Sequence, residues 1–216
     1  KEKAAINFDL LQWNPITLDY WQQYDITEEI LRFYNVYPVK NLYVFNYLPD
    51  SFTRDLPIYI YTFLQDDKKI GFKVYRPYRS KLKFLRKYDS SVIEGINQAR
   101  LLKEHVNNTL IITKSLKDVM CLFSAGFLAI SPPSETATIP ETLLLKLKAF
   151  YKHIFVLFDN DHTGIIKGKK LSEEYNLNYL CIDIDDTCKD FSDCCKRYGV
   201  INAKKWLLDK LNSYYD

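Results

Sequence analysis

The sequence predicts an α/β protein in which a mostly parallel sheet flanked by helices follows a smaller, basic α+β subdomain. From residue 109 onward, apolar runs of strand length alternate with helical segments, a pattern typical of parallel sheets. Before that point, hydrophobic residues recur with the period of two that indicates strands. Residues 68–87 contain nine Lys or Arg residues and no acid. We therefore expect two domains, residues 1–106 and residues 107–216.

The composition is that of a folded protein. Hydrophobic residues make up 47% of the 216 residues and aromatic residues 15%, which excludes a disordered chain. The five cysteines are odd in number and lack Cys-x-x-Cys spacing, so we expect reduced thiols rather than disulfides or a zinc site. No apolar run has membrane-spanning length. These features predict a cytoplasmic protein that does not contact a membrane.

The first domain is expected to begin with helices and continue with strands. Residues 1–40 are predicted to be helical, with Thr17 and Thr27 as helix caps because their hydroxyl groups can accept hydrogen bonds from the first turn. Three strands are predicted after Leu42, and a helical boundary segment follows them. The strands are residues 42–46, 58–64 and 69–76, with a hairpin turn at 65–68, and the boundary is residues 89–106.

The basic stretch at residues 68–87 has two interpretations. Lysine and arginine neutralise phosphates, and the interleaved Tyr and Phe residues offer faces on which bases stack, so the stretch is typical of nucleic-acid binding. Alternatively, lysines protect the solvated edge of a sheet. The length of the run without an acid favours nucleic acid. The predicted contacts are Lys73, Arg76, Arg79, Lys81, Lys83 and Arg86.

The second domain is predicted to alternate strands and helices. The expected strands are residues 109–113, 127–130, 154–158 and 177–184, and the expected helices are residues 116–125, 140–150, 165–175, 190–198 and 203–214. In such sheets, ligands bind at the carboxyl ends of the strands. We therefore expect the functional residues to follow the strands directly.

The central strand ends in two carboxylates, Asp159 and Asp161. Residues two apart in an extended chain project to the same side, so these carboxylates repel each other unless a cation lies between them. Mg²⁺ and similar hard cations prefer such oxygen ligands, usually together with water and substrate phosphates. A simple turn is the other interpretation, because Asp, Asn and Gly are common turn residues.

The second domain resembles the TOPRIM domain shared by bacterial-type primases, topoisomerases and some nucleases. The Asp-Asn-Asp-His-Thr-Gly stretch at residues 159–164 is similar to its Asp-x-Asp motif followed by Gly. Residues 110–118 match in frame the strand that ends in Glu-Gly-x-x-Asp, with Asp118 in place. Residues 189–199 resemble the Lys-Asp-Pro-Asp-type segment of primases, and residues 1–106 resemble the subdomain that precedes TOPRIM in primases and phage primase-helicases.

The sequence departs from the family motif at one critical position. Lys114 stands where the family has its catalytic glutamate, and Ser115 stands where it has glycine. Lys114 is suited to hold a nucleotide phosphate as a compact point charge. Glu135, just past the adjacent strand, is a candidate replacement carboxylate, and Lys167 is a candidate contact for the triphosphate.

The resemblance implies a DNA primase core that makes RNA primers on a single-stranded DNA template by nucleotidyl transfer. It implies Mg²⁺ or Mn²⁺ held by Asp159 and Asp161, with Asp118 nearby. Two alternatives remain open: a catalytically degenerate TOPRIM module that binds single strands within a replicative helicase-primase, and a TOPRIM nuclease. Lys114 keeps the degenerate module in consideration.

The primase resemblance also implies partners and a setting. The expected partners are single-stranded template, nucleoside triphosphates and a replicative helicase, either fused or separate. The composition, rich in Lys, Asn, Ile and Tyr, resembles that of bacteriophage primases, which implies the cytoplasm of a bacterial or phage-infected cell.

Overall fold

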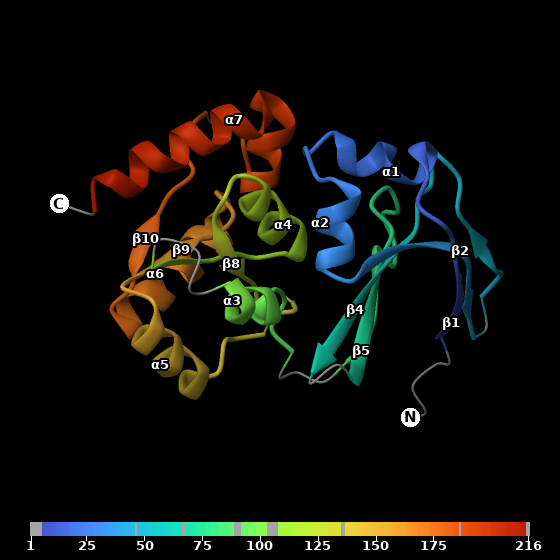
Figure 1. The fold of residues 1–216 in the computed structure, drawn as a ribbon, viewed down its shortest axis with the longest axis horizontal. Coiled ribbons are helices and arrows are strands. Elements are labelled where there is room, and N and C mark those ends of the chain that lie inside the picture. The colour runs from blue at the N-terminus through green and yellow to red at the C-terminus, as the bar shows by residue number, and fades with distance from the viewer. Residues whose placement is uncertain are drawn as a thin grey trace. The chain divides into compact units, whose positions relative to one another are not determined.

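The computed structural model describes residues 6–45, 47–65, 68–88, 92–102, 108–134, 137–185 and 187–214. The chain forms two compact units (Figure 1). The first unit contains residues 1–22 and 27–89, and the second contains residues 23–26 and 90–216. Within the described residues, the strands form two separate sheets rather than a single mostly parallel one. The predicted α/β class is confirmed, and the parallel sheet is confined to the second unit.

The sheet of the first unit is antiparallel. Its described strands are β1 (Ile6–Leu10), β2 (Val36–Val44), β3 (Asp50–Ser51), β4 (Tyr59–Gln65), β5 (Lys68–Tyr75) and β6 (Phe84–Lys87). They follow the order β1-β2-β4-β5-β6, and β3 pairs with β2. The predicted hairpin is confirmed, since Gln65 pairs with Lys68 at the end of the β4–β5 ladder.

The prediction that residues 1–40 are helical is wrong at both ends. Among the described residues 6–40, only α1 (Pro15–Gln22) and α2 (Glu28–Phe33) are helices, whereas β1 precedes them and β2 begins at Val36. The apolar residues at the start of β2 owe their extended form to pairing with β4, a long-range contact that local periodicity does not report.

One of the two predicted helix caps is confirmed. The side chain of Thr27 accepts a hydrogen bond from the Ile30 N–H and caps α2. The cap of α1 is instead Asn14, whose Oδ1 accepts hydrogen bonds from the N–H groups of Ile16 and Thr17. Asn is at least as favourable as Thr at the N-cap of a helix.

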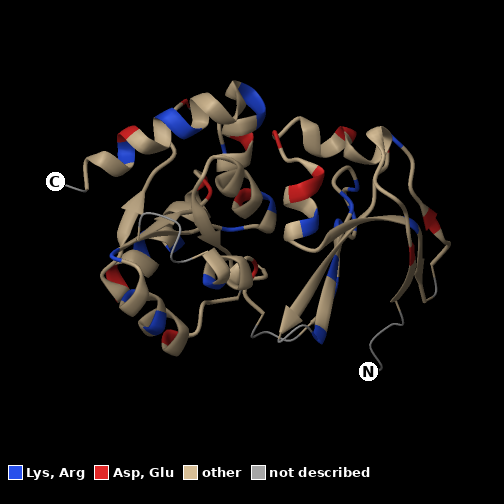
Figure 2. Ribbon diagram, in the orientation of Figure 1, with Lys and Arg blue, Asp and Glu red and all other residues tan. Residues whose placement is uncertain are grey.

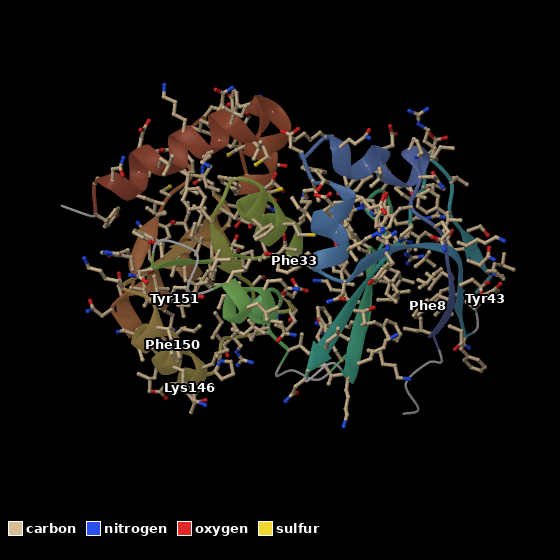
Figure 3. All side chains as sticks on the ribbon, viewed as in Figure 1. Phe8, Phe33, Tyr43, Lys146, Phe150 and Tyr151 are labelled. Carbon is tan, nitrogen blue, oxygen red and sulfur yellow. The ribbon has the colours of Figure 1, made fainter. Side chains whose placement is uncertain are left out.

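The core of the first unit is aromatic. Trp21 and Tyr59 are fully buried, with ring centroids 5.0 Å apart. The hydroxyl groups of Tyr20 and Tyr75 share a buried hydrogen bond of 2.5 Å, which ties α1 to β5. Phe8, labelled in Figure 3, packs edge-on against Phe72. These contacts fix β5, the strand with which the basic stretch begins.

The second unit contains a parallel sheet. Its described strands are β7 (Thr109–Ile112), β8 (Leu128–Ile130), β9 (His153–Leu157) and β10 (Asn178–Leu180), in the order β10-β9-β7-β8. Its described helices are α3 (Ile96–Leu102), α4 (Leu116–Ser124), α5 (Glu141–Phe150), α6 (His162–Tyr175) and α7 (Phe191–Asn212). The predicted strands and helices are all present, although β10 is shorter than predicted.

Helices cover both faces of this sheet. On one face, the side chains of Leu110 and Val156 pack in a cluster with α3, α5 and α6, where the Tyr151 hydroxyl donates a hydrogen bond to the Ala99 carbonyl (Figure 3). On the other face, Phe155 contacts Tyr214 just beyond α7. Strands buried on both faces are the reason for the continuous apolar runs in the sequence.

The two helices predicted near the C-terminus are joined as α7, with a kink at Gly199. This glycine has a φ of 77°, a left-handed conformation that favours glycine. The Val200 N–H beyond the kink donates a hydrogen bond to the Asp25 side chain, which replaces the helical bond lost there.

Gly164 lets α6 begin close against the end of β9. A Cβ atom at this position would lie 2.2 Å from the Asp159 carbonyl oxygen, whereas at Gly168 it would lie 2.7 Å from the Tyr179 ring edge. We expect Gly164→Ala to lower the free energy of unfolding by about 1–3 kcal/mol, because the backbone at Asp159 must shift. Gly168→Ala is the matched control and should cost less, since a ring can move. Urea unfolding of both variants measures these costs. A Gly164→Ala variant as stable as wild type would contradict the expectation.

Candidate functional site

The structure brings Asp159 and Asp161 together around one point at the carboxyl edge of the parallel sheet. Asp159 follows β9, and Asp161 caps α6 by accepting a hydrogen bond of 2.8 Å from the Gly164 N–H. The Nζ atom of Lys189 lies 3.1 Å from Asp161 Oδ2 and 3.6 Å from Asp159 Oδ2. The two carboxylates therefore converge on a position suited to a cation.

The two carboxylates differ in acidity. Burial raises the pKa of Asp159, and the nearby Asp190 charge raises it further. The Gly164 N–H and then the Lys189 ammonium lower the pKa of Asp161. Asp161 is thus the more acidic member of the pair, and Asp159 gains more from an additional cation.

Asp118 lies beneath this edge and is only 1% exposed. Ser115 Oγ donates a hydrogen bond of 2.5 Å to Asp118 Oδ2, and the Ser192 N–H donates one of 3.0 Å to Oδ1. Burial, followed by the Asp190 charge, raises the pKa of Asp118 to about 8. Asp118 therefore joins the start of α4 to the start of α7.

The start of α7 is attached to the carboxylate loop as well. Asp190 caps α7 by accepting hydrogen bonds from the Asp193 N–H and the Ser192 hydroxyl. The Asn160 N–H, between the two site aspartates, donates a hydrogen bond of 2.6 Å to the Lys189 carbonyl. These bonds fix the main chain at Lys189 beside the carboxylate pair.

Lys114 lies at the same edge, after β7. Its Nζ is 4.5 Å from the centroid of the Phe158 ring, and its charge lowers the pKa of Asp159. Lys114 also lines a cavity of about 250 Å³ together with Lys167 and Lys170 of α6. Phe158, Ile139 and Leu171 contribute an apolar wall to this cavity. A ligand that combines phosphate with an apolar ring suits such a lining.

The pair of aspartates fits a divalent ion that also binds substrate. Within the described parts of the chain, no cluster of three or more His, Cys, Asp or Glu residues could hold a metal. Mg²⁺ commonly takes one or two carboxylates and completes its shell with water and substrate phosphates. Two converging carboxylates meet this minimum. Glu135, the predicted replacement acid, lies outside the described residues.

The predicted nucleic-acid contacts in the first unit fall into two groups. Arg76 and Arg79 form ion pairs with Asp50 of β3, and Lys73 is 7% exposed with its Nζ 4.6 Å from the Phe84 ring centroid. The exposed members of the predicted set are Lys81, Lys83 and Arg86. In Figure 2 the ribbon is blue at the Lys and Arg residues. The second group is the more exposed one, whereas Arg76 and Arg79 of the first group are paired with Asp50.

Three residues with a place in the site carried no predicted role: Lys189, Ser115 and Ser192. The likeness of residues 189–199 to a primase segment was the only signal for Lys189. Ser115 is a recognisable helix cap, since its side chain accepts a hydrogen bond from the Asp118 N–H. Ser192 participates through its main-chain N–H, which no side-chain pattern reveals.

Comparison with known proteins gives a consistent result for the fold. No family model and no curated protein matches the sequence. Among solved structures, that of the Aquifex aeolicus primase, comprising zinc-binding and RNA polymerase domains, has a TM-score of 0.65 and 16% identity over 93% of this chain. The E. coli primase catalytic core gives a TM-score of 0.61 at 11% identity, covering 88% of this chain and 73% of that one.

The chain has the fold of a primase catalytic core. The primase fragment of the bacteriophage T7 primase-helicase is also similar, with a TM-score of 0.55 and 13% identity, covering 93% of this chain and 74% of that one. The chain spans 56% of the length of the Aquifex aeolicus protein. No helix in the described part of the chain is both long and apolar enough to cross a membrane.

The raised pKa of Asp118 predicts that the stability of the folded protein depends on pH. Because its pKa is raised on folding, the folded protein retains a proton between about pH 4 and pH 8 that the unfolded chain releases. The contribution of Asp118 to stability is therefore complete at low pH and is lost as the pH rises towards 8. The quantity to compare is the free energy of unfolding of wild type minus that of Asp118→Asn. We expect this difference to fall by roughly a few kcal/mol from pH 5 to pH 8.

Chemical unfolding at several pH values measures this difference. Asp118→Asn can keep both hydrogen bonds without a titrating group, so it serves as the reference. Asp118→Ala removes both bonds and should be less stable than Asp118→Asn at every pH. A difference between wild type and Asp118→Asn that stayed constant from pH 5 to pH 8 would contradict a raised pKa.

Proposed function

We propose that this chain is the catalytic core of a DNA primase, which makes RNA primers on single-stranded DNA by metal-dependent nucleotidyl transfer. The convergence of Asp159 and Asp161 at the carboxyl edge of the parallel sheet carries this proposal, because it occurs in a fold shared with primase cores. We assign the second unit to the TOPRIM class for the same reason. Nucleoside triphosphates are the proposed substrates.

Asp159 and Asp161 would hold Mg²⁺ or Mn²⁺. A divalent ion at this position lowers the cost of the attacking 3′-alkoxide and stabilises the leaving pyrophosphate. Asp161 contributes a full negative charge, and its bond to the Gly164 N–H keeps its orientation. Asp118 and Asp190 support the site from α4 and α7 without facing the reacting groups.

The cavity beside Asp159 suits the triphosphate of the incoming nucleotide. Lys114, Lys167 and Lys170 line it together with an apolar wall and one acid, Glu174, so the charged lining is positive on balance. Lysine binds phosphate as a point charge and tolerates several phosphate positions. In this proposal, Lys114 does not replace the family's glutamate in metal binding but takes part in phosphate binding.

The first unit provides the proposed contacts for single-stranded DNA. Lys81, Lys83 and Arg86 are exposed on and just before β6, together with the exposed rings of Tyr78 and Phe84. Basic groups follow the phosphate backbone, and aromatic rings stack on bases without selecting a sequence. One of the similar structures is a primase catalytic domain bound to single-stranded DNA. A replicative helicase is the further partner that we propose for this chain.

Lys114 supports a second candidate, a TOPRIM module that binds single strands within a helicase-primase but does not polymerise. A lysine in the position of the family's glutamate cannot bind metal or accept a proton in the same way. The two candidates differ in one measurable property, the extension of a primer.

Extension of an RNA primer already annealed to its template tests the catalytic proposal. We expect wild type to extend the primer in Mg²⁺ or Mn²⁺, and Asp161→Ala to reduce the rate about a hundredfold or more, because metal activation supplies several kcal/mol. Lys205→Met, which removes an exposed charge from α7, is the control. If wild type binds single-stranded DNA but does not extend the primer, the non-catalytic module is favoured. If wild type extends the primer and Asp161→Ala does not, Lys114→Glu and Glu135→Ala would show next which acid completes the site.

The basic surface is tested by the salt dependence of DNA binding. We expect Lys83→Ala and Arg86→Ala each to weaken binding to single-stranded DNA and to reduce the slope of log K against log [salt] by about 0.7, the value for one phosphate contact. Arg79→Ala is the comparison variant and should have a smaller effect, since the Arg79 guanidinium is already paired with Asp50. Fluorescence anisotropy at several salt concentrations measures the slopes. Equal effects of all three variants would contradict the division into two groups.

A further inference from the structure

Lys189 occupies the point on which the two site carboxylates converge. Its Nζ contacts both Asp159 and Asp161 through their Oδ2 atoms, at 3.6 Å and 3.1 Å. A divalent ion bound between these carboxylates would use the same oxygen atoms. An ammonium group and a divalent ion repel each other at such short range, so they cannot share this position.

The main chain of Lys189 is fixed, whereas its side chain has room to move. Its carbonyl accepts a hydrogen bond from the Asn160 N–H, and its own N–H donates one of 3.3 Å to Asp193 Oδ2. The side chain is nevertheless 56% exposed. Four rotatable bonds therefore allow the ammonium to leave the carboxylates while the backbone stays in place.

A displaced ammonium needs another anion nearby. Asp190 is engaged in capping α7, and Asp118 is buried between Ser115 and Ser192. Both carboxylates therefore already accept hydrogen bonds, and Asp118 is closed off from solvent. A nucleoside triphosphate brings several negative charges to this edge of the sheet, and phosphate oxygens are good acceptors for lysine.

We propose that Lys189 is a tethered cation that holds Asp159 and Asp161 together before the divalent ion binds, and that moves to the triphosphate when the ion and the nucleotide arrive. This inference rests on the proposed function. It makes metal binding weak in the absence of nucleotide and stronger in its presence. The two ligands then bind cooperatively, because the nucleotide provides the second position for the ammonium.

Mn²⁺ binding to the protein without nucleotide tests this role directly. Electron paramagnetic resonance of free Mn²⁺ gives the dissociation constant without any catalytic step. We expect Lys189→Met to bind Mn²⁺ roughly tenfold more tightly than wild type, a typical size for coupling between sites. Lys205→Met, the same change on the second half of α7, should leave Mn²⁺ affinity unchanged. Asp161→Ala should remove the tight binding from both backgrounds.

A second measurement adds a non-hydrolysable nucleoside triphosphate. In wild type and in the Lys205→Met control, the nucleotide should increase Mn²⁺ affinity more than it does in Asp161→Ala, where only the nucleotide's own metal binding remains. In Lys189→Met this additional increase should shrink several-fold. Lys189→Gln provides a second uncharged side chain, and thermal unfolding of each variant checks that it is folded.

The outcomes separate this inference from the proposed function. Unchanged or weaker Mn²⁺ binding by folded Lys189→Met and Lys189→Gln would overturn the role of Lys189, even if wild type extends primers. Mn²⁺ binding that does not depend on Asp161, together with absent primer extension, would instead overturn the proposed function. Tighter binding by both variants, abolished by Asp161→Ala, would support the tethered cation.

Discussion

Repulsion between the carboxylates of Asp159 and Asp161 is the constraint on which the rest of the site depends. The strand β9 and the start of α6 direct both groups to one point, and this arrangement is unfavourable without compensating positive charge. The Gly164 N–H and the Lys189 ammonium provide that compensation in the protein alone. These two groups thereby hold the carboxylates in the arrangement that the proposed divalent ion would use.

The surrounding fold supplies rigidity through main-chain groups more than through additional acids. Asp118 accepts a hydrogen bond from the Ser192 N–H, and the Lys189 carbonyl accepts one from the Asn160 N–H. The loop after β9 and the starts of α4 and α7 are thereby joined at one edge of the sheet. Asp118, which the family motif associates with the active site, thus acts from beneath it as a buried connection.

Tertiary contacts pair some basic residues of the stretch at 68–87 with an acid and leave others exposed to solvent. The stretch contains no acid, yet Asp50 of β3 lies against Arg76 and Arg79. Two arginines that look available in the sequence therefore stabilise the loop before β6. Lys83 and Arg86 remain exposed, so a count of basic residues in the sequence exceeds the number that face solvent.

The sequence by itself determined the parallel αβ order of the second unit, the β4–β5 hairpin and the positions of Asp159 and Asp161 after β9. These features follow from local periodicity and from the rule that parallel strands end at one edge. Only the tertiary structure decided that residues 6–10 and 36–40 are strands, that Lys189 lies between the aspartates and that Asp118 is buried. Each of these depends on residues distant in the chain, since strand pairing and ion pairing are set by what the fold places opposite a residue and not by its neighbours in sequence.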